Sequence, residues 1–113
     1  MRKTICIVIT LTVLLVLPRT SMAGEVTGPI SQIITRIDGL HYFYITGTAS
    51  SKPGCATSLY WMIKDENSVA GKSQFSQILT AYATGRTVKI VGNNSCTRWP
   101  DGEDVSAVFS MPQ

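Results

Sequence analysis

The stretch VAGKSQFSQILTAYATG, residues 69–85, decides the fold because it has the pattern of the one convincing helix in the chain. Its large apolar residues recur at positions i, i+3, i+4 and i+7, which places them on one face of a helix. They are Phe75, Ile78, Leu79 and Tyr82. Asn67 or Ser68 can cap the N-terminus, and Gly85 stands where a left-handed residue ends a helix. Such a helix must bury its apolar face against neighbouring strands.

Short segments with strand composition lie on both sides of this helix. The sequence predicts strands at residues 30–38, 41–48 and 55–64 before it, and at residues 87–91 and 105–110 after it. Three strands, a helix and two strands is the order of the OB-fold, a five-stranded partly open barrel. We therefore expect a mainly β, single OB-fold domain over residues 24–113, with one helix between strands 3 and 4. An unrelated α+β sandwich with the same element order is the alternative.

The first 23 residues have the pattern of an export signal peptide. Arg2 and Lys3 give a positive start, and residues 5–17 form an apolar run of about a dozen residues, too short to span a bilayer comfortably. Ser21 and Ala23 are the small residues that precede a cleavage site. We expect cleavage after Ala23, export to the periplasm or the medium, and no membrane span afterwards. An uncleaved N-terminal anchor is the alternative.

The residues that follow the signal peptide carry no net charge. The whole chain has 10 Lys and Arg residues against 7 Asp and Glu residues. Arg2, Lys3 and Arg19 leave with the signal peptide, which leaves seven residues of each sign. Nucleic-acid binders carry a basic surface, so we expect no nucleic-acid partner.

Two cysteines, Cys55 and Cys96, remain once Cys6 is removed with the signal peptide. Small exported domains join such cysteines, so the sequence predicts one disulfide bond, with two free buried thiols as the alternative. His41 is the only histidine and no C-x-x-C motif is present, so a zinc site would lack ligands. We expect no metal and no cofactor.

Residues that could carry catalysis are few. A nucleophilic triad needs a base, but the only histidine lies in a predicted strand and no G-x-S-x-G motif occurs. Asp101, Glu103 and Asp104 could supply a pair of carboxylates for general acid–base chemistry, although a solvated loop is the simpler interpretation. We therefore expect no enzyme activity, and this acidic segment is the only support for a small hydrolase.

Aromatic residues are numerous for so small a domain. They are Tyr42, Tyr44, Tyr60, Trp61, Tyr82 and Trp99. Exposed aromatic faces stack on sugars or bases, and the absence of net charge favours sugars. Arg98 and Trp99 follow Cys96, so a disulfide would hold a loop that offers a donor and an indole plate. Burial in the core or in a subunit interface is the alternative for each aromatic side chain.

Motifs spread over residues 33–100 resemble one family. They are ITRIDG before HYFYI at 41–45, Cys55-Ala56, YATG at 82–85, VKI at 88–90 and TRWP at 97–100. The pattern is similar to the B subunit of subtilase cytotoxin and to the B subunits of typhoid and pertussis-like toxins. The resemblance implies an OB-fold protomer that forms a homopentamer, binds sialylated or other host glycans and delivers a catalytic A chain.

The resemblance carries over only some of the family's site residues. The family's glycan pocket uses a serine near the first strand, which Ser31 roughly matches, and a tyrosine where Gly92 stands here. Tyr44 occupies the position of a family cysteine, which leaves Cys96 as the partner of Cys55. The glycan-binding residues that we expect are Ser31, Tyr42, Arg98 and Trp99. The alternative function is a periplasmic OB-fold protein that binds an envelope protein or small ligand without a toxin role.

Overall fold

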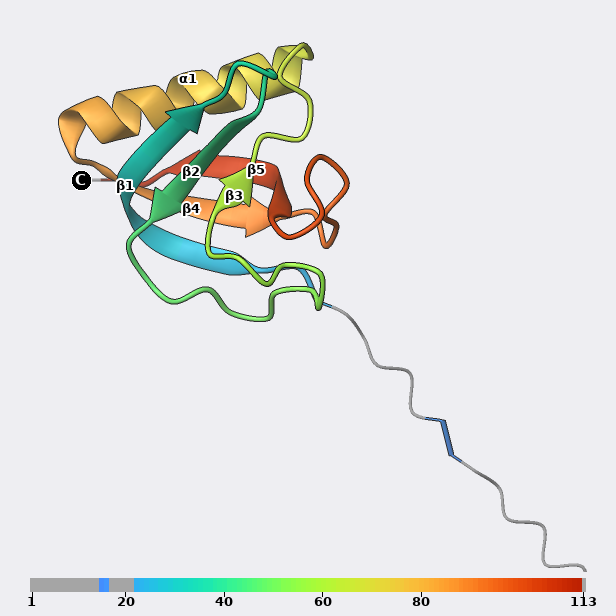
Figure 1. Cartoon of the computed structure of the whole chain (residues 1–113). Helices are drawn as coiled ribbons and strands as arrows, with labels where there is room; N and C mark the ends of the chain where they lie inside the picture. Colours follow the sequence, from blue (N-terminus) through green and yellow to red (C-terminus); the bar gives the residue numbers. More distant parts are fainter. Residues whose placement is uncertain (1–14, 17–21, 113) are drawn as a thin grey trace, which may run out of the picture.

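The structure, a computed structural model, describes residues 15–16 and 22–112. In chain order they form β1 (Glu25–Thr35), β2 (His41–Ile45), β3 (Trp61–Met62), α1 (Val69–Thr84), β4 (Thr87–Gly92) and β5 (Glu103–Ser110). The strands close into a barrel in the order β1-β2-β3-β5-β4, with β3 and β5 parallel and the other pairs antiparallel (Figure 1). The predicted OB-like fold, with one helix between strands 3 and 4, is confirmed. Most of the expected signal peptide lies outside the described residues.

Strand β1 closes the barrel because it pairs with two strands, β2 and β4. Its first half pairs with β4 and its second half with β2, and the register shifts between Ile30 and Gln32. A bulge of this kind bends a strand, which lets β1 curve around the barrel (Figure 1). A side chain at residue 28 would place its Cβ 1.8 Å from the Thr46 carbonyl oxygen, so Gly28 permits the close approach of the next chain segment. The strand begins at Glu25 because residues 25–29 pair with β4, whereas the sequence predicts a start at residue 30.

Strand β3 is much shorter than the predicted strand at residues 55–64. Only Trp61 and Met62 pair with neighbouring strands. The backbone amide of Ser58 instead donates to the carbonyl of Asp101 at 3.0 Å, so this segment is tied to a loop. Leu59 is 77% exposed although Trp61 is buried, whereas two residues of a regular strand at this spacing would share one face.

The buried apolar side chains form one cluster inside the barrel, and α1 covers one end of it (Figure 1). The cluster contains Val26, Ile30, Phe43, Trp61, Ile63, Ile78, Ala81, Val88, Ile90 and Val105. The helix contacts β1, β4 and β5. In the described part of the chain, no helix has the length and apolar character needed to cross a membrane.

Helix α1 begins and ends where the sequence predicts. The Gly71 amide donates to the Ser68 hydroxyl oxygen at 2.9 Å, so Ser68 is the N-cap. Gly85 has a φ of 68° and ends the helix in the left-handed conformation. Both signals are local, which is why the sequence alone identifies them.

The buried face of α1 differs from the predicted one. Ile78 is fully buried, but Leu79 is 45% and Tyr82 is 52% exposed. The small residue Ala81 packs with Ile78 in the barrel core instead. Gly71 is also buried, and a Cβ there would lie 1.8 Å from the Asp65 carbonyl oxygen in the turn before the helix. The buried face of the helix is thus centred on Ile78 and Ala81, and Leu79 and Tyr82 lie on its outer side.

The predicted disulfide joins Cys55 and Cys96, whose Cα atoms are 6.2 Å apart. It links the connection between β2 and β3 to the loop between β4 and β5. Two connections that lie far apart in the sequence are thereby fixed to each other on one side of the barrel.

Replacing both cysteines, Cys55→Ser with Cys96→Ser, should lower the free energy of unfolding by about 4 kcal/mol. The disulfide spans a sequence separation of 41, and closing a loop of this size restricts the unfolded chain. Urea unfolding of the two proteins measures the difference, and the reduced natural chain is the control. Unfolding midpoints that coincide for all three samples would contradict the prediction.

Candidate functional site

A hollow of about 190 Å³ lies beside β2 and β3, between the turn after β1 and the loop between β4 and β5. Its lining residues are Arg36, Leu40, Tyr42, Tyr60, Met62 and Trp99, and we call it the aromatic hollow. Leu40 and Met62 are fully buried and form apolar parts of its wall. OB-folds bind oligosaccharides and oligonucleotides on the face of strands 2 and 3 and on these two loops. The aromatic hollow therefore occupies the usual ligand position of the fold.

Tyrosine rings line one side of the aromatic hollow and contact one another. The rings of Tyr42 and Tyr60 have centroids 5.0 Å apart, and Tyr44 meets Tyr60 edge-on at 6.0 Å. The Tyr60 hydroxyl donates to the Asp101 carboxylate, which also accepts from the Ser58 hydroxyl at 2.9 Å. These contacts fix Tyr60, so this wall of the hollow is in place before any ligand arrives.

Arg36 and Trp99 form the opposite part of the hollow. The Arg36 guanidinium carbon lies 4.9 Å from the centroid of the Trp99 ring, and the indole is 37% exposed. Arg36 also donates to the Asp38 carboxylate at 2.8 Å, with both side chains about 40% exposed. An ion pair so open to water contributes little, so the guanidinium can exchange Asp38 for a ligand oxygen. The hollow thus offers an aromatic plate with a planar donor beside it.

The loop that carries Trp99 is held by the buried carboxylate of Asp104. This carboxylate accepts from the hydroxyls of Ser95 at 2.8 Å and Thr97 at 2.6 Å, and from the amides of Thr97 at 2.9 Å and Arg98 at 3.2 Å. Burial by itself raises the pKa of Asp104, but these hydrogen bonds outweigh it and leave the pKa below its ordinary value. The loop is therefore anchored immediately before Trp99.

The acidic segment is not the solvated loop that the sequence favours. Glu103 and Asp104 are both 0% exposed, and they are the first two residues of β5. Glu103 accepts from the backbone amides of Gly24 and Asn94. Hydrogen-bond donors from the backbone replace water at both carboxylates, which makes their burial tolerable. They serve as structural groups. Gly24 is distant in the sequence and the other donors belong to residues 94–98, and only the fold of this loop aims them at the two carboxylates.

The four residues expected to bind a glycan fall into different surroundings. Tyr42 and Trp99 both line the aromatic hollow. The guanidinium of Arg98 forms a two-pronged pair with Glu66, in which Nε lies 3.0 Å from both carboxylate oxygens. This bond lowers the pKa of Glu66. Ser31 lines a separate hollow of about 210 Å³, together with Lys52.

Arg36, Leu40, Tyr60 and Met62 line the aromatic hollow but are absent from the residues expected to bind a glycan. Tyr60 is among the aromatic residues noted in the sequence, and Arg36 has a usable signal because it directly precedes the turn that joins β1 to β2. Among the residues that the structure describes, the His, Cys, Asp and Glu side chains form no group of three that could hold a metal ion.

Comparison of the chain with protein-family models, with curated proteins and with solved structures finds no match. The resemblance to toxin B subunits therefore stays an expectation from the sequence motifs. The position and lining of the aromatic hollow have to carry the functional argument.

The variant Asp104→Asn should lower the free energy of unfolding at pH 7 by about 3 kcal/mol, since charged hydrogen bonds to a buried group are lost. The folded-state pKa of Asp104 lies below its ordinary value. Its stabilisation is therefore present above the unfolded-state pKa of about 3.9 and is lost as the pH falls through the folded-state pKa. Urea unfolding from pH 7 to pH 3 should show the two proteins converging at acidic pH. A constant difference would contradict this origin.

The matched control for this measurement is Glu25→Gln. Glu25 is a half-exposed carboxylate that pairs with Lys89 at 3.2 Å. A surface ion pair contributes less than about 1 kcal/mol, so the control should change the unfolding midpoint only slightly.

Proposed function

We propose that the chain is an exported, non-catalytic protein that binds an oligosaccharide in the aromatic hollow. The observation that carries this proposal is the meeting of Tyr42, Tyr60, Arg36 and Trp99 at the ligand position of an OB-fold. A sugar ring has an apolar face and a polar edge. The exposed indole suits the apolar face, and the guanidinium of Arg36 suits a hydroxyl or carboxylate on the edge.

The charge of the chain supports a sugar over a nucleic acid. Among the residues that the structure describes, Arg36 is the only cationic one that lines the aromatic hollow. A groove that follows a phosphate backbone needs several cations, and seven residues of each sign leave the mature chain neutral. An oligosaccharide needs only stacking surfaces and a few fixed hydrogen-bond partners.

The variant Trp99→Ala should weaken binding of the best glycan about tenfold or more. Truncating an aromatic side chain at the centre of a binding site commonly costs about 2 kcal/mol or more, and 1.4 kcal/mol is a factor of ten. A glycan array with neutral and acidic sugars finds the ligand, and calorimetry measures the affinity. An array on which the natural chain binds no glycan would contradict the proposal, and so would unchanged affinity of the variant.

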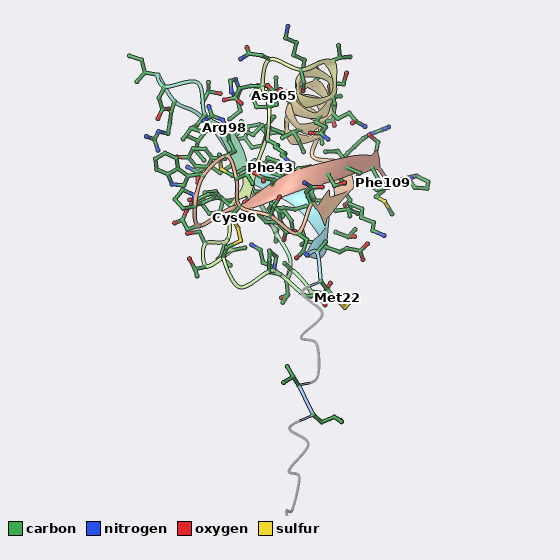
Figure 2. The ribbon with its side chains drawn as sticks, turned by 90° about the vertical axis from the view of Figure 1, so that its right-hand side faces the viewer. Met22, Phe43, Asp65, Cys96, Arg98 and Phe109 are labelled. Carbon is green, nitrogen blue, oxygen red and sulfur yellow. A yellow bond between two sulfur atoms is a disulfide. The ribbon has the colours of Figure 1, made fainter. Side chains whose placement is uncertain are left out.

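Phe109→Ala is the matched control because it removes another half-exposed aromatic ring. Phe109 is 49% exposed at the far end of β5, and Figure 2 shows it on the side of the barrel away from Arg98. Its removal should leave glycan affinity unchanged, whereas an equal loss in both variants would point to a general effect on folding.

The proposal includes the assembly that the resemblance implies, a homopentamer that delivers a partner A chain to host cells. Leu79 and Tyr82 support association, because they leave two large, half-exposed side chains on the outer surface of α1. The same surface would suit an envelope protein. A periplasmic interaction protein without a toxin role is therefore the second candidate.

Light scattering of the exported chain under non-reducing conditions should give the mass of five protomers. Leu79→Ser with Tyr82→Ser should shift the mass towards the monomer, because the change removes the apolar contact surface. Ser73→Ala, on an exposed position of the same helix, is the control. A monomeric natural chain that co-purifies with one envelope protein would favour the second candidate.

A further inference from the structure

The backbone nitrogen of Gly24 lies against the carboxylate of Glu103. Its distances to Oε1 and Oε2 are both 3.1 Å, and both residues are buried. Glu103 is the first residue of β5, whereas Gly24 directly precedes β1. Gly24 is also the residue that follows the expected cleavage site at Ala23. The structure thus places the future amino terminus on a buried anion.

The packing around this contact fits Gly24 and leaves little room for another residue. A Cβ on residue 24 would lie 2.6 Å from Oε1 of Glu103 and 2.9 Å from the Trp61 ring. A Cβ on Gly92 would lie 1.8 Å from Oε2 of Glu103, so a second glycine makes space for the carboxylate. The Gly92 amide also donates to the Gly24 carbonyl at 2.8 Å. Residue 24 is therefore fixed from several directions.

The charge of Glu103 is the unusual feature of this site. The ion pairs between described side chains are Arg36–Asp38, Lys89–Glu25 and Arg98–Glu66, and none of them includes Glu103. Lys52 is the nearby cation that feels this charge, but its ammonium donates to the Ser58 carbonyl at 2.9 Å and lies over the Trp61 ring. Buried charges in proteins are as a rule both hydrogen-bonded and paired with an opposite charge.

We propose that cleavage after Ala23 turns the Gly24 nitrogen into the cation that pairs with Glu103. Hydrolysis breaks the peptide bond, water supplies the hydroxyl of the new Ala23 carboxylic acid, and the Gly24 nitrogen gains protons to become an ammonium. One N–H donor becomes three, enough for both carboxylate oxygens of Glu103 and for water in the space that Ala23 leaves. The inference rests on the signal peptide of the proposed function and is independent of glycan binding.

This pair adds an ionic contact to a barrel that is already closed around Gly24. The ammonium joins the start of β1 to the start of β5. These two strands are not neighbours in the barrel. The first residue of the mature chain is then a structural part of the fold.

The test uses the whole chain, with its signal peptide, produced in an exporting bacterium. Mass spectrometry of the product should show Gly24 as the first residue. The folded product is then treated with an amine-acylating reagent at pH 7. Its terminal amine should react at least tenfold more slowly than in the urea-unfolded product, because the ammonium is buried and paired.

The matched variant carries one extra glycine inserted between Ala23 and Gly24. Its amine stands one residue away from Glu103, so it should react in the folded state nearly as fast as in urea. Glu103→Gln keeps the shape of the side chain without the charge, and the folded variant should lose the protection. Where this substitution prevents folding, the insertion still provides the comparison, since it leaves Glu103 intact.

The outcomes separate this inference from the proposed function. A product that keeps its signal peptide overturns both the export and the ion pair. A product cleaved at another residue, or a Gly24 amine that reacts equally fast in the folded and unfolded states, overturns the ion pair alone. Protection that persists in folded Glu103→Gln also overturns it, because burial would then suffice.

Discussion

The burial of two adjacent carboxylates at the start of β5 is the constraint on which the rest of the structure depends. Successive residues of a strand point to opposite sides, so Glu103 reaches the start of β1 while Asp104 reaches the loop before Trp99. Their strand partners in β3 are the fully buried Trp61 and Met62. Backbone donors surround both carboxylates, which makes the low-polarity site tolerable. The two buried carboxylates thus fix both the start of β1 and the loop that carries Trp99.

Contacts in the loop that carries Asp104's hydrogen-bond donors also fix the side chains of the aromatic hollow. The loop with Trp99 is fixed by the disulfide at Cys96 and by the hydrogen bonds to Asp104. Asp101, in the same loop, holds the hydroxyl of Tyr60 on the other side of the hollow. A ligand that meets a site already in its binding geometry loses less entropy on binding. This preorganisation favours a binding role with few contacts, such as recognition of a sugar.

Helix α1 contributes no residue to the aromatic hollow, the proposed ligand site. Ile78 and Ala81 of the helix pack into the barrel core and cover one end of the barrel. Leu79 and Tyr82 are left on the outer surface, away from the aromatic hollow. Two surfaces of different character, one aromatic and hollow and one helical and apolar, therefore exist on a domain of one barrel and one helix.

The sequence by itself determined the features that depend on near neighbours. The ends of α1 follow from Ser68 and Gly85, the order of elements indicated the barrel, and two remaining cysteines indicated the disulfide. Only the tertiary structure decided which face of α1 is buried, how short β3 is, and that Tyr42 and Trp99 share one hollow. It also decided the burial of the acidic segment. Each of these depends on contacts between residues far apart in the chain, whose distances and hydrogen-bond partners are set only when the barrel closes.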